Sequence, residues 1–65
     1  NNSFEGSMKV GNMVKWSGDQ SSPPLAGMVI DTCMIDGLPH ATVFWFDLRV
    51  SNHHPYMDLT TISRA

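Results

Sequence analysis

The stretch Ala-Thr-Val-Phe-Trp-Phe at residues 41–46 is the strongest indicator of fold class in this chain. Its residue types favour β-structure, and apart from Thr42 they are apolar on both alternating faces of a strand. A strand in a small antiparallel sheet usually has one core face and one wet face, so it alternates apolar and polar residues. Here Ala41, Val43 and Trp45 are expected to fill a core. Phe44 and Phe46 lie on the opposite face, where either another part of the chain or a partner must cover them.

Short β-prone runs flank this stretch and are separated by turn residues. We expect a first strand within residues 9–16, a second at 26–34, a fourth that starts at 49–51 and a last at 60–63. In the second run, Asp31 predicts that Val29 and Cys33 share its exposed face, and that Met28, Ile30, Thr32 and Met34 form the more buried set. No helical period of any length appears. The pattern predicts an all-β domain.

Each connection carries its own turn chemistry. Ser, Gly, Asp and two prolines at residues 17–24 predict a long exposed loop, because proline cannot donate to a strand ladder. Asp36-Gly37 predicts a tight turn into the central strand, since both residue types tolerate positive φ. Pro55 ends the fourth strand, and residues 56–59 predict a 3₁₀ turn before the last strand. This layout predicts a single small five-stranded SH3-like barrel.

Composition limits the classes of function. Sixty-five residues allow one domain, and Cys33 is the only cysteine, so no internal disulfide or cysteine-based zinc site is expected and a reducing, cytoplasmic location is favoured. Charged residues are 15% of the chain, against roughly 25% in an ordinary soluble domain. This low charge favours self-association, and the net charge of −2 offers no basic surface for a nucleic acid backbone. No run approaches the roughly 18 apolar residues of a membrane span.

The first seven residues, Asn-Asn-Ser-Phe-Glu-Gly-Ser, differ in character from the rest of the chain. They are expected to be an added expression leader, disordered or irregular, with the barrel occupying residues 8–65.

Four groups of residues together resemble the small SH3-like barrels that tailed bacteriophages and mobile elements often encode. They are Val10-Gly11-x-x-Val14-x-Trp16, Gly27-x-Val29, Ala41-x-Val43-x-Trp45 and His54-Pro55-x-x-Asp58-Leu59-x-x-Ile62. The resemblance spans residues 8–63, and its motifs are core and turn positions. It implies a domain in the cytoplasm of a bacterial host, acting as an adaptor or as a virion component. Phe46-Asp47-Leu48 departs from the usual Asp-Gly turn of the group.

One enzyme has a similar outline, the plasmid-type dihydrofolate reductase, a tetramer of SH3-like barrels whose pore is lined by a Val-Gln-Ile-Tyr run. The corresponding residues 49–56 read Arg-Val-Ser-Asn-His-His-Pro-Tyr, so the run is absent and that activity is a remote alternative. No nucleophile elbow, phosphate-binding glycine loop or suggestive carboxylate pair occurs either. We therefore expect no catalytic residues, no cofactor and no enzymatic activity.

The histidines and the cysteine invite a metal hypothesis. His53 and His54 are adjacent on a strand and point to opposite faces, so a shared ion would also need His40 or Asp47 brought close by folding. Cys33 has no helix N-terminus nearby to activate it. The expectation is no metal site, and a half-buried structural thiol.

The aromatic residues outnumber what a small core needs. We predict an exposed interface formed by Met13, Phe44, Phe46 and Tyr56, which serves self-association or a protein partner. An alternative is a nucleic-acid-binding barrel with Trp16 and Tyr56 as stacking groups beside Lys9, Lys15 and Arg49. A virion structural subunit is a third interpretation that uses the same surface as the first.

Overall fold

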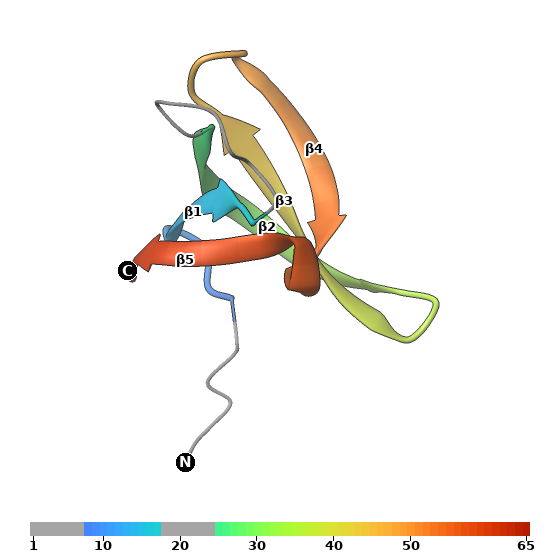
Figure 1. Ribbon diagram of the computed structural model, residues 1–65. Coiled ribbons are helices and arrows are strands. Elements are labelled where there is room, and N and C mark those ends of the chain that lie inside the picture. The colour runs from blue at the N-terminus through green and yellow to red at the C-terminus, as the bar shows by residue number, and fades with distance from the viewer. Residues whose placement is uncertain (1–7, 18–24) are drawn as a thin grey trace.

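Five antiparallel strands form one curved sheet (Figure 1). The computed structural model describes residues 8–17 and 25–65; the expected leader and most of the expected first loop lie outside this range. The strands are β1 (Met13–Trp16), β2 (Ala26–Ile35), β3 (Leu38–Trp45), β4 (Val50–Pro55) and β5 (Leu59–Ser63), and a 3₁₀ turn, η2 (Tyr56–Asp58), precedes β5. Their order in the sheet is β4-β3-β2-β1-β5. The expected all-β layout, with a 3₁₀ turn before the last strand, is confirmed.

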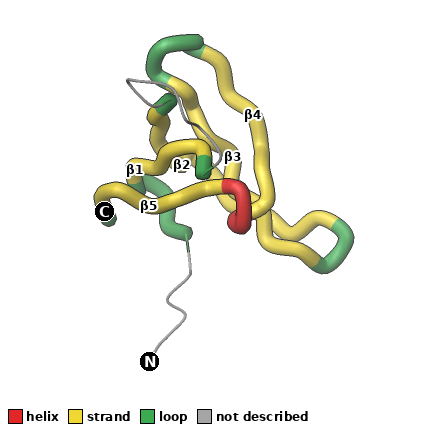
Figure 2. The backbone as a smooth tube through the Cα atoms, in the orientation of Figure 1, coloured by secondary structure: helices red, strands yellow, loops and turns green. Residues whose placement is uncertain are grey.

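The long strand β2 connects the two halves of the sheet. Its first residues pair with β1, and residues 27–29 and 31–35 pair with β3. Val29 lies opposite Val43 but Asp31 lies opposite Thr42, so Ile30 has no partner and forms a β-bulge. A bulge bends its strand and increases the local twist. In Figure 2 the β2–β3 hairpin extends well beyond the rest of the sheet, and η2 lies between β4 and β5.

The bulge overturns the predicted faces of β2. Val29, expected on the exposed face with Asp31, is fully buried, whereas Ile30 and Met34, expected to be buried, are 45% and 65% exposed. The extra residue at Ile30 breaks the simple alternation, so Val29 and Asp31 no longer share a face. Met34 is exposed because it lies in the outer part of the hairpin, past the core.

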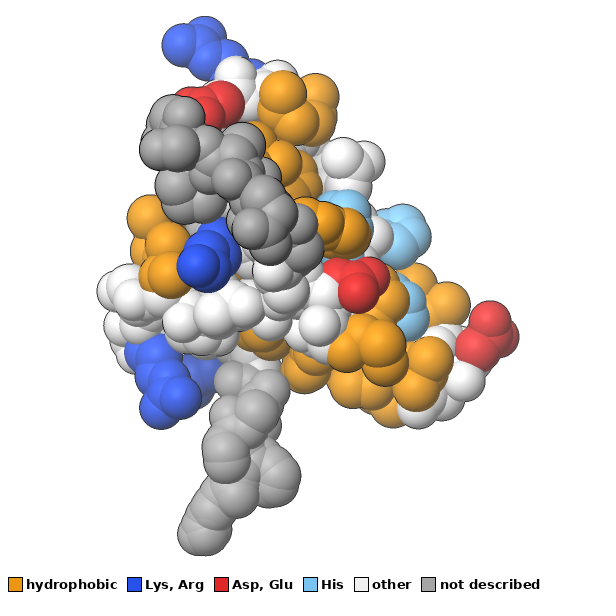
Figure 3. Space-filling model, in the orientation of Figure 1, with side chains coloured by type: hydrophobic (Ala, Val, Ile, Leu, Met, Phe, Trp, Pro, Cys, Tyr) orange, Lys and Arg blue, Asp and Glu red, His pale blue; other side chains and the backbone are white. Residues whose placement is uncertain are grey.

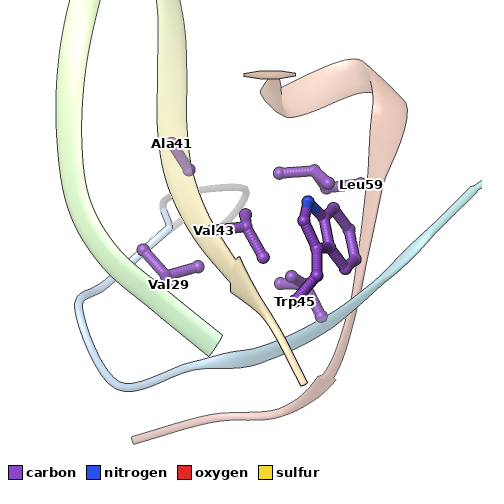
Figure 4. Close-up of a cluster of buried hydrophobic side chains, with 6 residues drawn as sticks. Val29, Ala41, Val43, Trp45 and Leu59 are labelled. Carbon is purple, nitrogen blue, oxygen red and sulfur yellow. The ribbon is translucent and has the colours of Figure 1, made fainter. Parts of the chain in front are cut away.

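The core lies on one face of the sheet. Its buried side chains are Val14, Val29, Ala41, Val43, Trp45 and Leu59, most of which are labelled in Figure 4. The predicted inward face of residues 41–46 is confirmed. Gly27, opposite Trp45, allows β2 to approach β3 closely: a Cβ at this position would lie 2.5 Å from the carbonyl oxygen of Phe44 and 2.6 Å from Cγ1 of Val43.

The two hairpin turns use different residues to reach the left-handed conformation. Asp36 and Gly37 both have positive φ, 51° and 79°, which confirms the tight turn predicted between β2 and β3. The turn between β3 and β4 instead places Arg49 at φ 55°, and its amide donates to the carbonyl of Trp45 at 2.8 Å. The chain therefore turns after Phe46 without an Asp-Gly pair.

Candidate functional site

Four apolar side chains form a continuous surface on the face of the sheet opposite the core. We call Met13, Met28, Phe44 and Phe46 the outward strip. Met28 lies directly opposite Met13 on β1 and Phe44 on β3, so these three side chains stand side by side across three strands. The rings of Phe44 and Phe46 meet edge to face, with centroids 6.1 Å apart.

The exposure of the strip follows from alternation along β3. Because Val43 and Trp45 point into the core, Phe44 and Phe46 must point away from it. Phe46 is 37% exposed, and Met13, Met28 and Phe44 are half-buried. They are partly buried because each of these side chains has close neighbours in the strip on the paired strands.

The structure brings together three of the four predicted interface residues. Met13, Phe44 and Phe46 lie in the outward strip, but Tyr56 belongs to η2 and packs against the buried core. Pro55 ends β4, and the chain then turns back over the core side of the sheet. Met28 joins the strip although simple alternation predicts it on the more buried face of β2. The cross-strand register that reveals this is not visible in the sequence.

A second candidate site lies on the core side of the sheet. A hollow of about 270 Å³ is lined by Trp16, Leu25, Trp45, Leu48, Asn52 and His54. We call it the tryptophan pocket. Trp16 ends β1, Trp45 ends β3, and His54 lies on β4 opposite Ala41, a core residue. Sequence reasoning missed this pocket because its lining residues come from separate strands and turns.

His54 connects the two tryptophans. Its ring centroid is 4.9 Å from that of Trp16 and 5.6 Å from that of Trp45, with interplanar angles of 71° and 67°. The indole Nε1–H of Trp45 donates to Nε2 of His54 at 3.3 Å. Burial lowers the pKa of His54 below its usual value, and the nearby Asp58 carboxylate only partly opposes this. At neutral pH the ring is therefore uncharged and carries its proton on Nδ1.

The remaining histidines and Cys33 lie elsewhere. As predicted, His53 and His54 face opposite sides of the sheet: His53 pairs with Thr42, and its ring lies 6.4 Å from that of His40. His40 Nδ1 is hydrogen-bonded to the carbonyl of Leu38 at 2.9 Å. Within residues 8–17 and 25–65, no group of three or more His, Cys, Asp and Glu side chains is placed to hold a metal ion. Cys33 is exposed, so the prediction of a half-buried thiol was wrong, because the β2–β3 hairpin extends past the core.

Lysine and arginine side chains do not gather beside either site. Lys9 precedes β1, Lys15 lies within it, Arg49 lies in the β3–β4 turn and Arg64 follows β5. The view in Figure 3 shows positive side chains at the top, left of centre and at the lower left. This spread differs from the clustered cations that a nucleic acid backbone needs.

Comparisons with protein-family models, with curated proteins and with solved structures found no match to this chain. Among the residues that the structure describes, no helix has the length and apolar character needed to cross a membrane.

Proposed function

We propose that this domain is a non-catalytic protein-interaction module whose contact surface is the outward strip. The observation that carries the proposal is the cross-strand row Met13, Met28 and Phe44, extended by the ring of Phe46, on the face opposite the core. Aromatic residues and methionine are enriched at the centres of protein interfaces, and charged residues are depleted there. The strip has this composition and contains no charged side chain.

The size of the strip supports a role as the centre of an interface. A fully exposed phenylalanine side chain offers about 150–250 Å². Because Phe46 is 37% exposed and the other three side chains are half-buried, the strip presents about 100–300 Å² of apolar surface. A standard interface buries about 800 Å² on each partner. The strip is therefore suited to the core of such an interface, with polar neighbours forming its rim.

A second copy of the chain is the first partner to test. Two strips can face one another across a two-fold axis, because each is apolar and uncharged. The low proportion of charged residues, 15%, also favours self-association. An adaptor and a virion subunit would both use this surface.

The test compares solution mass for the wild-type chain and two aspartate variants. We expect the wild type to be a dimer or larger by light scattering at micromolar concentration, and Phe44→Asp to be a folded monomer. The matched control is Met57→Asp, which adds the same charge at a residue that is 74% exposed in η2, outside the strip. This control should keep the wild-type mass.

Phe44 is half-buried, so the mass of its variant is informative only while the variant stays folded. Phe46→Asp, in the turn after β3, changes the more exposed end of the strip and provides a second variant. A wild-type chain that remains monomeric up to millimolar concentration would exclude self-association. Equal masses for the wild type, Phe46→Asp and Met57→Asp would show that the strip is not the contact surface.

A further inference from the structure

Two histidines lie on the same face of the sheet as the outward strip. On β3, His40 and Thr42 alternate with the buried Ala41 and Val43, so they point to the strip's side of the sheet. His53 lies opposite Thr42 on β4 and therefore shares this face. The ring centroids of His40 and His53 are 6.4 Å apart, and His53 is exposed.

The cross-strand register places His53 directly beside the strip. Phe44 lies opposite Ser51, and the next pair on the same face is Thr42 with His53. Residues two apart on a strand are separated by about 7 Å, so the row of His53 lies about 7 Å from the row of Phe44, and the row of His40 follows it. Thr42 and Ser51, which lie between, carry no charge. The strip and the two histidines therefore form one continuous surface.

The strip is too small to make a standard interface alone. It presents about 100–300 Å² of apolar surface, whereas such an interface buries about 800 Å² on each partner. A roughly circular patch of about 800 Å² extends about 16 Å from its centre. A contact centred on the strip therefore covers the row that contains His53, and the row of His40 lies near its rim.

Given the proposed function, on which this step rests, we propose that the contact between two copies of the chain covers His53, so that protonation of this side chain at mildly acidic pH separates the copies. A partner surface over an imidazole removes the water that stabilises its charged form. The neutral form loses much less on burial. The dimer therefore favours neutral His53, and its stability is present at neutral pH and lost as the pH falls.

The titratable groups around His53 come from three strands and η2: His40 on β3, Asp31 and Cys33 on β2, His54 on β4 and Asp58 on η2. Of these residue types, only histidine ordinarily changes charge between pH 5 and 8. His54 faces the core side of the sheet, and Thr42 separates Asp31 from His53. On the contact face, His40 therefore gains charge together with His53. Two imidazolium rings at this distance repel one another, which adds to the effect.

The test measures the dimer dissociation constant by analytical ultracentrifugation at about pH 7.5 and about pH 5.5, at constant ionic strength. One pH unit below the ordinary histidine pKa, the charged form outnumbers the neutral form about tenfold. Each dimer contains two copies of His53, so the dissociation constant should rise about 10- to 100-fold at the lower pH. Circular dichroism at both pH values checks that the chain stays folded.

His53 and His54 provide a matched pair of variants, because they are adjacent on β4 and face opposite sides of the sheet. Glutamine keeps a polar side chain at either position and does not titrate. His53→Gln should remove most of the pH dependence of the dissociation constant. His54→Gln should keep it, and His40→Gln should reduce it by less than His53→Gln does.

Proton NMR provides a second measurement that needs no change at His53. The C2–H signal of each histidine is titrated at a concentration at which the wild type is dimeric, and again in Phe46→Asp, which is expected to be monomeric. The titration midpoint of His53 should be lower in the dimer by about 0.5–1 pH unit, because the partner disfavours the charged form. The midpoint of His54, on the other face, should be the same in both proteins.

A wild-type dimer with the same dissociation constant at both pH values would overturn the role of His53 and leave the strip as the contact surface. The same holds if His53→Gln shows the full pH dependence of the wild type, or if the midpoint of His53 is equal in dimer and monomer. A wild-type chain that is monomeric at both pH values would instead overturn the self-contact itself. The two proposals therefore fail with different results.

Discussion

Replacing Gly27 with alanine tests the close approach of β2 and β3, which positions both candidate sites. The added methyl group would lie 2.5 Å from the carbonyl oxygen of Phe44, 2.6 Å from Cγ1 of Val43 and 3.0 Å from Cε3 of Trp45. The first contact is with backbone, so it cannot be relieved by a side-chain rotation. The strands must separate, which disturbs Phe44 in the outward strip and Trp45 in the tryptophan pocket.

The expected loss of stability is the cost of overpacking. Forcing an extra methyl group into a well-packed core costs about 1–3 kcal/mol, and a contact with backbone favours the upper part of that range. A domain of this size is stabilised by only about 3–5 kcal/mol, so Gly27→Ala should remove half or more of the stability. With a urea slope of about 1 kcal/mol per molar, the unfolding midpoint should fall by about 2–3 M.

Urea unfolding followed by tryptophan fluorescence measures this change. The control is Gly37→Ala at the hairpin tip, where a Cβ meets nothing within 4 Å and only the positive φ of 79° opposes the substitution. That strain costs about 1 kcal/mol, so Gly37→Ala should lower the midpoint by less than half as much. A Gly27→Ala protein with a midpoint within about 0.5 M of the wild type would refute the close packing of β2 on β3.

The other predictions concern His54 and Cys33. Burial lowers the pKa of His54 in the folded state, so as the pH falls the unfolded chain binds a proton at this histidine before the folded chain does. The contribution of His54 to the free energy of unfolding should therefore be fully present above 6.5, its pKa in the unfolded chain, and should be lost as the pH falls through its lower pKa in the folded state. The charged groups around it are Asp58 on η2, His53 on β4 and His40 on β3. Between about pH 7.5 and pH 5, the urea midpoint should decrease more for the wild type than for His54→Gln. An equal decrease of the midpoint with pH in both proteins would contradict this account. Cys33, exposed on the protruding hairpin, should react with a thiol reagent in the native protein nearly as fast as in the unfolded one. Strong protection of the native thiol would show that the hairpin is covered, for instance by a second copy.

The outward strip was largely predictable, because alternation along residues 41–46 is a local property of any strand. Once Trp45 is assigned to the core, Phe44 and Phe46 must point away from it. The contribution of Met28 was not predictable. It depends on the register of β2 against β1 and β3, which strands far apart in the sequence establish only on folding.

The tryptophan pocket could not be derived from the sequence. Trp16 lies far along the chain from Trp45 and His54, which are nine residues apart on the paired strands β3 and β4, and no spacing among the three signals a common site. They lie close together because β3 pairs with β4, and β5, which follows β4 in the chain, pairs with β1. Tyr56 shows the same limitation, since its place against the core depends on how η2 folds back over the sheet.

Local sequence was sufficient to predict the strands, the tight Asp36-Gly37 turn, the 3₁₀ turn after Pro55 and the inward face of Val43 and Trp45. These features depend on backbone preferences and on alternation over a few residues, which are physical properties of short segments. The bulge at Ile30, and with it the buried face of β2, became evident only in the folded chain. The same is true of which aromatic side chains share a surface. Both outcomes depend on the free energy of packing between distant strands, which no local segment contains.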